Sequence, residues 1–417
     1  MPLLPILART LEGVLEETLA ASRVVVLAGP RQTGKSTLAQ ALCSRLGGTY
    51  LSLDNATELA AAQREPEAFL QRTFPLVVDE FQRAGEGLLL AVKAAVDRDR
   101  RRGRFLLTGS TRFLSLPTLS ESLAGRVALV EMGPFTQGEL AGTRDRFLDR
   151  LFAGRDALLG IPCSPPTRAD VFERICAGGY PEARTRAGRS RRRWFSDYAR
   201  TVTQRDVADF SRARRLGDLP RLLRLLAART AQELVTAKVA AELGMPRTTL
   251  DGYLPLLDSV YLTTRLSAWA GHPRGKAVHH PKLHLVDAGL AAALTDATPA
   301  KMEDPAYPMT GALLETFVVG ELLRQRAWAE VEVELAHFRD RDGAEVDVVV
   351  EARDGRTAGI EVKTASSVNG HDFRGLETLA RRLGKKFVVG CVLYLGPRAH
   401  PFGDRLAAVP VSALWAP

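Results

Sequence analysis

The stretch Gly29-Pro30-Arg31-Gln32-Thr33-Gly34-Lys35-Ser36 decides the fold of this chain. It follows an apolar run over residues 24–28 and precedes an amphipathic helical pattern over residues 36–46. Its eight positions match the phosphate-binding loop in the strand–loop–helix context that this loop requires. Glycines let such a backbone curl around phosphates. A chance match on a glycine turn is the alternative, and the flanking strand and helix disfavour it.

The loop predicts a site for ATP and Mg²⁺. We expect Lys35 to bridge the β- and γ-phosphates and Ser36 to ligate Mg²⁺, with the helix N-terminus adding a favourable field. The expected nucleotide-binding residues are nine consecutive positions: Gly29, Pro30, Arg31, Gln32, Thr33, Gly34, Lys35, Ser36 and Thr37.

A second apolar run, over residues 76–78, ends in the acids Asp79 and Glu80. Asp79 is expected beside the metal, and Glu80 is expected to be the catalytic group that polarises water. Two acids at the end of a strand are commonly only solvated. Their position after the phosphate-binding loop favours the functional interpretation.

Two more catalytic candidates follow. Ser110, or Thr108, comes after the apolar run 105–107 and could hold the attacking water or the γ-phosphate. A helix N-cap is an equally good interpretation of these hydroxyls. Arg126 precedes a fourth apolar run, over residues 127–132, where it could act as an arginine finger towards a neighbouring subunit. The alternative is an ordinary surface arginine.

Strand runs that are apolar on both faces, separated by helical stretches, predict an α/β fold with a parallel sheet covered by helices. A chain of 417 residues is expected to form two or three domains. Its four cysteines are scattered without any CxxC pair, which disfavours disulfides or zinc and favours a reducing cytoplasm. No apolar run approaches the length of a membrane span, so we expect no membrane partner.

The segments 29–37, 78–82, 107–110 and 123–126 together resemble a family of prokaryotic AAA+ ATPases, as do the stretches 178–182, 282–290 and 311–315. In that family an ATPase module precedes an uncharacterised C-terminal region with a winged helix and a restriction-endonuclease-like domain. The resemblance extends over nearly the whole chain and implies a homo-oligomeric ring, such as a hexamer. It implies four regions: an AAA+ core over 1–153, a helical lid and basic segment over 154–230, a winged helix over 231–298 and a PD-(D/E)XK nuclease-like domain over 299–417.

Residues 345–363 carry the PD-(D/E)XK pattern itself. Asp347 lies on one predicted strand, and Glu361 and Lys363 share one face of the next. We expect Asp347 and Glu361 to bind Mg²⁺, Lys363 to activate water, and Glu315 to add a carboxylate. For Asp347 to lie on the same face as Glu361 and Lys363, the connection near Asp354 must have three or five residues or contain a bulge. An amphipathic hairpin, or a nuclease-like fold that serves only as scaffold, are the alternatives.

The positive charge is concentrated in one segment. Residues 184–229 hold fourteen arginines against four aspartates, a local charge of +10 in a chain of net charge +9. Such an excess attracts polyanions, with nucleic acid the commonest, although a solvated helical surface would look the same. A helix–glycine turn–helix pattern follows over residues 236–250. The expected nucleic-acid contacts are Arg191, Arg192, Arg193, Arg247, Thr248, Arg274 and Lys276.

The sequence therefore predicts an ATP-driven, Mg²⁺-dependent oligomeric ATPase that acts on nucleic acid, with DNA favoured, and carries a second, endonuclease-like site. The rival hypothesis is a nucleotide-gated switch or DNA-binding regulator whose nuclease-like domain is scaffold. A chaperone-like protein remodeller is a third.

Overall fold

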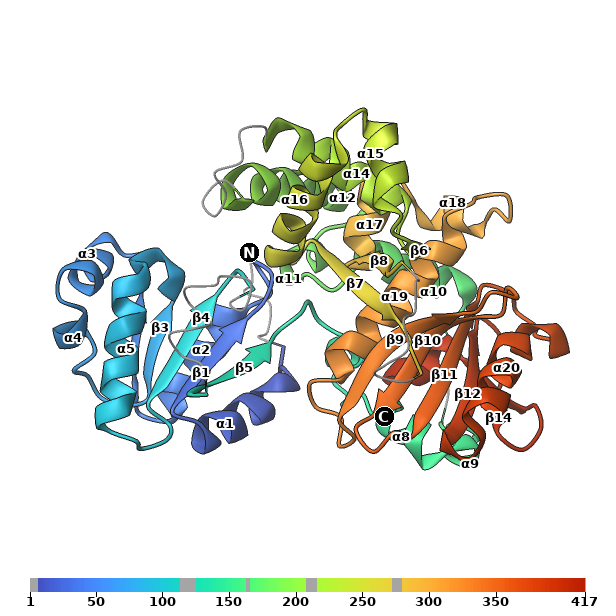
Figure 1. Cartoon of the computed structure of the whole chain (residues 1–417), viewed down its shortest axis with the longest axis horizontal. Coiled ribbons are helices and arrows are strands. Elements are labelled where there is room, and N and C mark those ends of the chain that lie inside the picture. Colours follow the sequence, from blue (N-terminus) through green and yellow to red (C-terminus); the bar gives the residue numbers. More distant parts are fainter. Residues whose placement is uncertain (1–6, 113–124, 163–165, 208–215, 272–279, 417) are drawn as a thin grey trace. The chain divides into compact units, whose positions relative to one another are not determined.

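The computed structural model describes residues 7–112, 125–162, 166–207, 216–271 and 280–416. The chain divides into two compact units. The first comprises Met1–Phe135 with Asp258–Tyr261, and the second comprises Thr136–Leu257 with Leu262–Pro417. Figure 1 shows the first unit in blue to green and most of the second in green to red.

The first unit is built on a parallel five-stranded sheet in the order β2-β3-β4-β1-β5. Strands β1, β3 and β4 are completely buried, which explains why they are apolar on both faces. The strand bounds are Val24–Ala28 (β1), Thr49–Ser52 (β2), Leu76–Asp79 (β3), Phe105–Gly109 (β4) and Val127–Glu131 (β5).

Helices connect these strands and share their core. Leu88, Val92 and Val96 of α5 pack into the same apolar cluster as Val26 of β1 and Leu107 of β4. The helix bounds are Leu11–Ala21 (α1), Lys35–Arg45 (α2), Ala56–Arg64 (α3), Pro66–Phe69 (α4) and Glu86–Arg98 (α5). Because all five strands are parallel, the loops after β1, β3 and β4 meet at one edge of the sheet, where ligands bind in open α/β folds.

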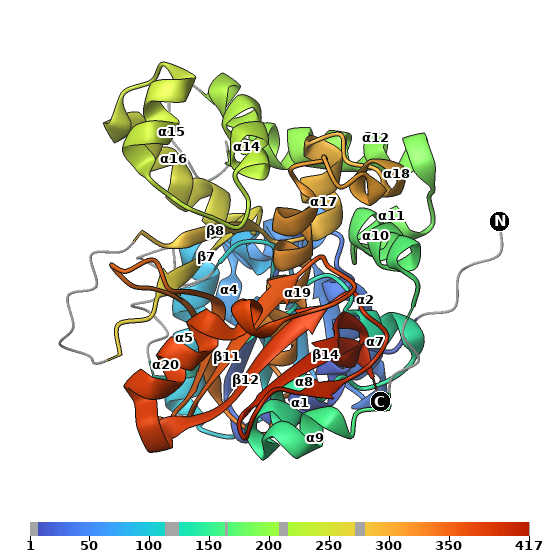
Figure 2. The ribbon, with the colours of Figure 1, turned by 90° about the vertical axis from the view of Figure 1, so that its right-hand side faces the viewer.

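The second unit contains a nine-stranded sheet in the order β13-β14-β12-β11-β10-β9-β7-β8-β6. Figure 2 shows strands β11, β12 and β14 of this sheet with α20 beside them. The strand bounds are Gln232–Glu233 (β6), Thr263–Ala268 (β7), Lys282–Leu285 (β8), Val333–Arg339 (β9), Glu345–Ala352 (β10), Thr357–Lys363 (β11), Phe387–Tyr394 (β12), His400–Pro401 (β13) and Leu406–Pro410 (β14).

The α-helices of the second unit lie before and between these strands along the chain. Helix α20 packs on the sheet through Leu376 and Leu379, and a Cβ at Gly359 would lie 2.6 Å from a methyl carbon of Leu376, which would have to shift. The helix bounds are Gln137–Ala141 (α7), Phe147–Ala153 (α8), Arg155–Leu159 (α9), Arg168–Ala177 (α10), Pro181–Arg184 (α11), Gly188–Thr201 (α12), Leu219–Ala228 (α14), Thr236–Leu243 (α15), Arg247–Ser259 (α16), Ala288–Leu294 (α17), Pro299–Glu303 (α18), Thr310–Gln325 (α19) and Arg374–Leu383 (α20).

The division of the chain differs from the four predicted regions. The first unit ends at Phe135 rather than at residue 153, because residues 136–153 pack with the C-terminal part of the chain. The backbone amide of Gln137 donates to the Glu321 carboxylate at 3.0 Å. The Trp328 indole N–H donates to the Asp145 carbonyl at the same distance. The predicted regions 154–230 and 299–417 lie in the second unit, as does 231–298 apart from Asp258–Tyr261. There β7 pairs with β9, which joins strands of the last two regions in one sheet.

Residues 236–259 form two helices joined by a glycine turn, as the sequence predicts. Gly244 caps the end of α15, where its positive φ of 65° suits glycine, and α16 begins at Arg247. Strand β8 then pairs antiparallel with both β6 and β7. No helix in the described part of the chain combines the length and the apolarity that crossing a bilayer requires.

Candidate functional site

The phosphate-binding loop connects β1 to α2 in the first unit. A side chain at Gly29 would place its Cβ 2.1 Å from the Met132 carbonyl oxygen, so this position accepts only glycine. Gly34 caps α2 with a φ of 94°, a left-handed conformation that also favours glycine. The two glycines of the motif are therefore required by the backbone itself.

Lys35 begins α2, and its side chain is buried, with 5% of its surface exposed. Its ammonium donates to the carbonyl oxygens of Gly29 at 2.9 Å and Pro30 at 2.7 Å. Burial lowers the pKa of Lys35 to about 8, although the nearby Glu80 and Asp79 charges oppose that shift. The ammonium is thus held by neutral groups, which phosphate oxygens could replace.

Asp79, at the end of β3, gathers hydroxyl groups from three neighbouring elements. Ser36 donates to its Oδ1 at 3.0 Å, and Tyr50 of β2 donates to its Oδ2 at 2.9 Å. The Thr108 hydroxyl of β4 also donates to Oδ1. Ser36 and Asp79 therefore bring together two hard oxygen donors of the kind that Mg²⁺ prefers. These residues fit a magnesium ion bound with a nucleotide.

Glu80 follows Asp79 and has the left-handed φ of 54°. Non-glycine residues in this region are strained and concentrate at functional sites. The Gln82 amide donates to its carboxylate, and the Ser110 hydroxyl donates to the same Oε2 at 3.4 Å. Ser110 thus lies beside the side chain that is expected to polarise water.

Two residues of this site were missed in the sequence. Gln82 lies two positions after Glu80, and this closeness in sequence to the acid pair could have identified it as a site residue. Nothing in the sequence indicated that Tyr50 belongs to the site, because its strand β2 is half-buried and was not predicted.

Arg126 lies at the opposite edge of the sheet from the phosphate-binding loop. It directly precedes β5, which runs parallel to β1, whereas the loop follows the end of β1. Its guanidinium donates to both carboxylate oxygens of Asp97, at 2.6 and 3.0 Å. Within this unit Arg126 therefore lies away from the phosphate-binding loop, at the amino end of β5.

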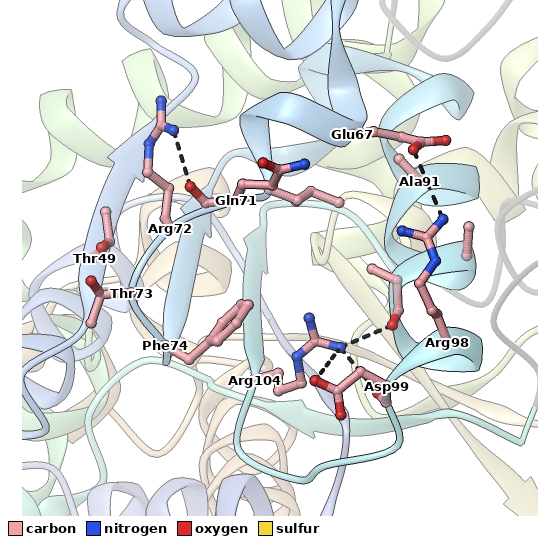
Figure 3. Close-up of a pocket in the computed structure, with 13 residues that line it drawn as sticks. Thr49, Glu67, Gln71, Arg72, Thr73, Phe74, Ala91, Arg98, Asp99 and Arg104 are labelled. Atoms are coloured by element: carbon pink, nitrogen blue, oxygen red, sulfur yellow. Dashed lines mark hydrogen bonds and ion pairs between the residues drawn. The ribbon is translucent and has the colours of Figure 1, made fainter.

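A cavity of about 680 Å³ also lies at the amino ends of the strands (Figure 3). Thr49 at the start of β2, Phe74 before β3 and Arg104 before β4 contribute to its lining. Arg104 stacks over the Phe74 ring, 4.5 Å from its centroid. This cavity is separate from the phosphate-binding loop.

In the second unit, β10 and β11 form a hairpin with the three-residue connection 353–355. Val348 pairs with Ile360 and Glu351 with Thr357, and the Ala352 amide donates to the Arg356 carbonyl at 2.8 Å. Continued by one residue, this register places Asp347 opposite Glu361 and therefore on the same face. The register against β9 also shifts between Val346 and Val349. The odd connection predicted near Asp354 is confirmed, whereas the register shift lies on the β9 side of β10 and does not bear on that prediction.

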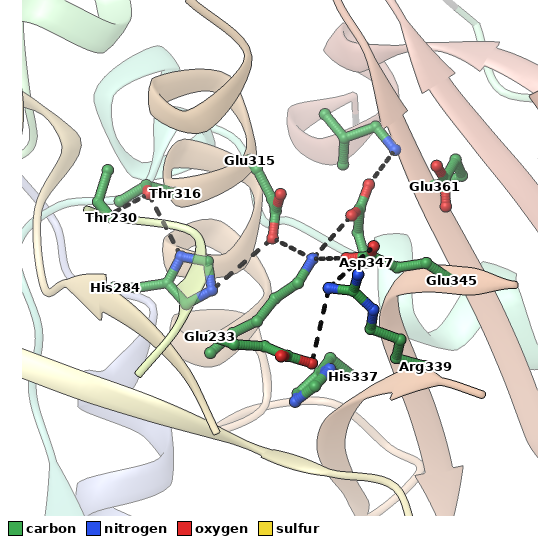
Figure 4. Close-up of polar contacts among 12 residues, drawn as sticks. Thr230, Glu233, His284, Glu315, Thr316, His337, Arg339, Glu345, Asp347 and Glu361 are labelled. Atoms are coloured by element: carbon green, nitrogen blue, oxygen red, sulfur yellow. Dashed lines mark hydrogen bonds and ion pairs between the residues drawn. The ribbon is translucent and has the colours of Figure 1, made fainter. Parts of the chain in front are cut away.

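The side chains around Asp347 converge on an ammonium group (Figure 4). Lys282 of β8 lies 3.0 Å from Glu315 Oε1, and 2.9 Å from both Glu345 Oε1 and Asp347 Oδ1. Burial opposes the charge of Lys282, but the carboxylates of Asp347, Glu315 and Glu345 together raise its pKa. Lys282 was not among the predicted site residues.

Glu361 lies at the edge of this cluster, and its Oε1 accepts from Lys363 at 2.8 Å. Burial and the Asp347 charge raise the pKa of Glu361 to about 8, although Lys363 opposes the shift. Within the described residues, no three His, Cys, Asp or Glu side chains form a group able to hold a metal ion. Glu315, Asp347 and Glu361 therefore do not fit Mg²⁺ as they stand, because a lysine neutralises their cluster.

The expected nucleic-acid contacts differ in their surroundings. The Arg191 guanidinium donates to the Ala183 and Arg186 carbonyls and pairs with Glu173 at 2.7 Å. Arg192 is half-buried. The side chains of Arg193, Arg247 and Thr248 are exposed; Arg274 and Lys276 lie outside the described residues.

Three family descriptions match separate parts of the chain. Residues 21–141 match an AAA domain, residues 168–301 match a domain of unknown function (DUF8612), and residues 310–414 match another (DUF4143). The N-terminal region is thus an AAA-type P-loop ATPase domain, in agreement with its parallel sheet and loop. The identities of the winged-helix and nuclease-like regions are not given by these matches.

Two curated relatives are similar along most of the chain. Uncharacterized protein Mb2031c of Mycobacterium bovis and Uncharacterized protein Rv2008c of Mycobacterium tuberculosis are each 27% identical over 402 residues, covering 96% of this chain and 82% of the relative. Among solved structures, the Thermotoga maritima RuvB Holliday junction branch migration motor matches at 20% identity and a TM-score of 0.29, covering 65% of this chain and 91% of that one. AMPPCP-bound DnaA from Aquifex aeolicus matches at 13% identity and a TM-score of 0.28, covering 60% and 86%.

Proposed function

We propose that this protein is an ATP-driven, Mg²⁺-dependent AAA+ ATPase. The observation that carries the proposal is the hydrogen bond between Ser36 and Asp79, directly after the buried Lys35. It joins the loop after β1 to the end of β3, which is the pairing that a nucleotide–magnesium site requires.

Each group in the site has a distinct role in this proposal. Lys35 exchanges its two carbonyl contacts for phosphate oxygens and neutralises their charge. Ser36 and Asp79 hold Mg²⁺, which, when bound, offsets further phosphate charge. Glu80 orients the attacking water and takes its proton, while Gln82 and Ser110 fix the carboxylate.

The direct test compares two lysine variants. Lys35→Ala should reduce ATP turnover by at least about a hundredfold, because it removes the charge aimed at the phosphates. Lys238→Ala, at an exposed lysine of α15, should leave turnover unchanged. Phosphate release from both variants and the unaltered protein would be measured at saturating ATP. Turnover that survives Lys35→Ala would overturn the site assignment.

We also propose that the ATPase is a cytoplasmic homo-oligomer in which Arg126 leaves Asp97 and serves a neighbouring subunit. Arg126→Ala should then lower turnover, and mixing it with Lys35→Ala chains should restore part of the lost activity. Mixed oligomers would regain activity because some sites receive Lys35 and Arg126 from different chains. Failure of such mixtures to regain any activity would contradict the trans role.

For the second unit we propose a winged helix over 231–298 and a PD-(D/E)XK nuclease-like fold over 299–417, acting on nucleic acid and preferably DNA. The exposed Arg193 and Arg247 and the hairpin register of Asp347 and Glu361 support this. Lys282 favours the rival interpretation, a nuclease-like scaffold in a nucleotide-gated switch. DNA that stimulates ATP turnover would support nucleic-acid action, and turnover indifferent to every DNA form would favour the switch.

A further inference from the structure

The cavity at the amino ends of the strands is lined only by residues of the first unit (Figure 3). Its volume of about 680 Å³ falls within the range of roughly 300–1,000 Å³ that small-molecule sites occupy. Because the phosphate-binding loop follows β1 at the other edge of the sheet, a nucleotide bound by that loop does not fill this cavity. The cavity therefore has room for a second ligand.

Arg104 is the most deeply buried charged residue of the lining, with 9% of its surface exposed. Its Nη1 donates to the carbonyl oxygens of Ala95 at 2.9 Å and Asp99 at 3.0 Å. Its Nε is buried and has no hydrogen-bond partner among the described residues. Figure 3 shows the other end of the guanidinium turned into the space between Phe74 and Arg98. Arg104 thus directs a cation, held mainly by neutral carbonyl groups, at the cavity.

The acid beside Arg104 is shared with a second arginine. The Asp99 carboxylate lies 3.6 Å from Arg104 Nη1. Arg101 donates to both oxygens of this carboxylate, at distances between 2.6 and 3.1 Å. Burial lowers the pKa of Arg104, the Asp99 charge opposes that shift, and the Arg101 charge adds to it. The charge of Arg104 is therefore incompletely compensated, and an anion in the cavity would stabilise it.

The charges of the whole lining indicate which anion fits. Arg72, Arg98 and Arg104 line the cavity together with Glu67 and Asp99, so three arginines against two acids leave one net positive charge. A carboxylate balances this charge, whereas a phosphate dianion exceeds it. Guanidinium groups also match the two oxygens of a carboxylate in geometry.

The apolar part of the wall consists of one aromatic ring and small side chains of α5. Arg104 covers the Phe74 ring, 4.5 Å from its centroid, so the ring lies directly beside the cation. Ala91, Ala94 and Ala95 line the cavity from α5. Because burial of apolar surface is favourable, a ligand with an apolar body would gain affinity beyond that of its charge.

We propose that this cavity binds a small organic carboxylate, with its anionic group at Arg104 and its apolar body against Phe74 and the alanines of α5. Binding there would not require ATP hydrolysis, since no lining residue belongs to the phosphate-binding loop.

The test titrates cinnamate into the full chain and follows its binding by saturation-transfer NMR. Two comparison compounds each lack one feature: cinnamyl alcohol has the apolar body without the charge, and acetate has the charge without that body. Cinnamate should bind at least about tenfold more tightly than either compound, because charged hydrogen bonds and apolar burial both contribute. Equal affinity of cinnamate and cinnamyl alcohol, or of cinnamate and acetate, would overturn the proposal.

Two tryptophan substitutions on α5 assign the binding to the cavity. Ala94→Trp fills the cavity from an exposed position and should weaken cinnamate binding at least about tenfold. Leu90→Trp, at an exposed position outside the lining, is the matched control and should bind cinnamate like the unaltered protein. Unchanged binding in Ala94→Trp, or an equal loss in Leu90→Trp, would overturn the proposal.

The role of the cation is tested by Arg104→Met. A folded Arg104→Met protein should bind cinnamate no more tightly than cinnamyl alcohol, because the charged partner of the carboxylate is gone. A preference for cinnamate that survives this substitution would contradict the assignment of Arg104. The tryptophan substitutions leave Arg104 in place, so they decide the question even if Arg104→Met fails to fold.

Discussion

Two buried lysines of this chain have opposite electrostatic settings. Lys35 donates to two backbone carbonyls, and burial lowers its pKa to about 8. Lys282 is surrounded by three carboxylates, which raise its pKa despite burial. A cation held by neutral groups remains available to an incoming anion, whereas a cation paired with acids is already neutralised. The comparison indicates that the ligands of a lysine, rather than its burial, decide whether it forms an open binding site.

The largest effect is expected at the open site. Glu80→Gln should slow ATP hydrolysis by about 10²–10⁴-fold, because the amide can hold water but cannot take its proton. Single-turnover hydrolysis measured beside nucleotide binding would separate the two steps. Binding should remain close to normal, since Ser36 and Asp79 are unchanged. Undiminished hydrolysis in Glu80→Gln would remove Glu80 from its assigned role.

The next effect concerns stability and contrasts the two lysines directly. Lys282→Met should destabilise the second unit by about 3–5 kcal/mol at pH 7, because it leaves buried carboxylates uncompensated. All four tryptophans lie in this unit, so their fluorescence during urea unfolding reports its stability. The destabilisation should shrink on acidification, as the unpaired carboxylates take up protons.

Lys35→Met is the matched control for that substitution. It removes an ammonium that donates only to carbonyls, so we expect a change within about 1.5 kcal/mol in the first unit. Circular dichroism during urea unfolding reports both units. Its comparison with the tryptophan fluorescence of the second unit would isolate the first unit, which has no tryptophan. Equal losses of unfolding free energy in Lys35→Met and Lys282→Met would contradict the contrast between the two lysines.

A third, smaller effect is a pH dependence of ATP affinity. The ammonium form of Lys35 is the one that binds phosphate, and this form is lost as the pH rises through about 8. Affinity should therefore be greatest below pH 8 and fall up to about tenfold by pH 9, since one proton is involved. Lys35→Arg keeps its charge across this range and should show a flatter profile. Affinity that rises towards pH 9 would contradict the assignment.

The smallest effect is expected at Tyr50. Tyr50→Phe removes one hydrogen bond to Asp79, which is worth about 0.5–1.5 kcal/mol. The apparent affinity for Mg²⁺ in the ATPase reaction should fall about two- to tenfold, with little change at saturating Mg²⁺. A titration of turnover against Mg²⁺ would measure this.

The open site was largely predictable because its signals are local. Gly29, Gly34 and Lys35 lie within one short loop, and the acid pair follows a fully apolar strand. The half-buried β2 was missed since its residues Thr49–Ser52 carry no apolar run. Strand β3 extends to Asp79, one residue beyond the predicted apolar run.

The carboxylate cluster around Lys282 was only partly predictable. The hairpin of Asp347 and Glu361 follows from strand alternation and turn length, which are local properties. Lys282 gave no such signal, because it meets Glu315 and Asp347 across 33 and 65 positions of sequence. Only the pairing of distant strands brings its charge into the cluster.

The central claim is that the loop after β1 binds ATP with Mg²⁺ held by Ser36 and Asp79, and calorimetry tests it most directly. Titration of ATP with Mg²⁺ into the intact protein should show one nucleotide bound per chain, and Asp79→Asn should remove the contribution of Mg²⁺ to that affinity. A protein that releases no heat with ATP and shows no binding by equilibrium dialysis, or an Asp79→Asn variant with the full Mg²⁺ effect, would contradict the account.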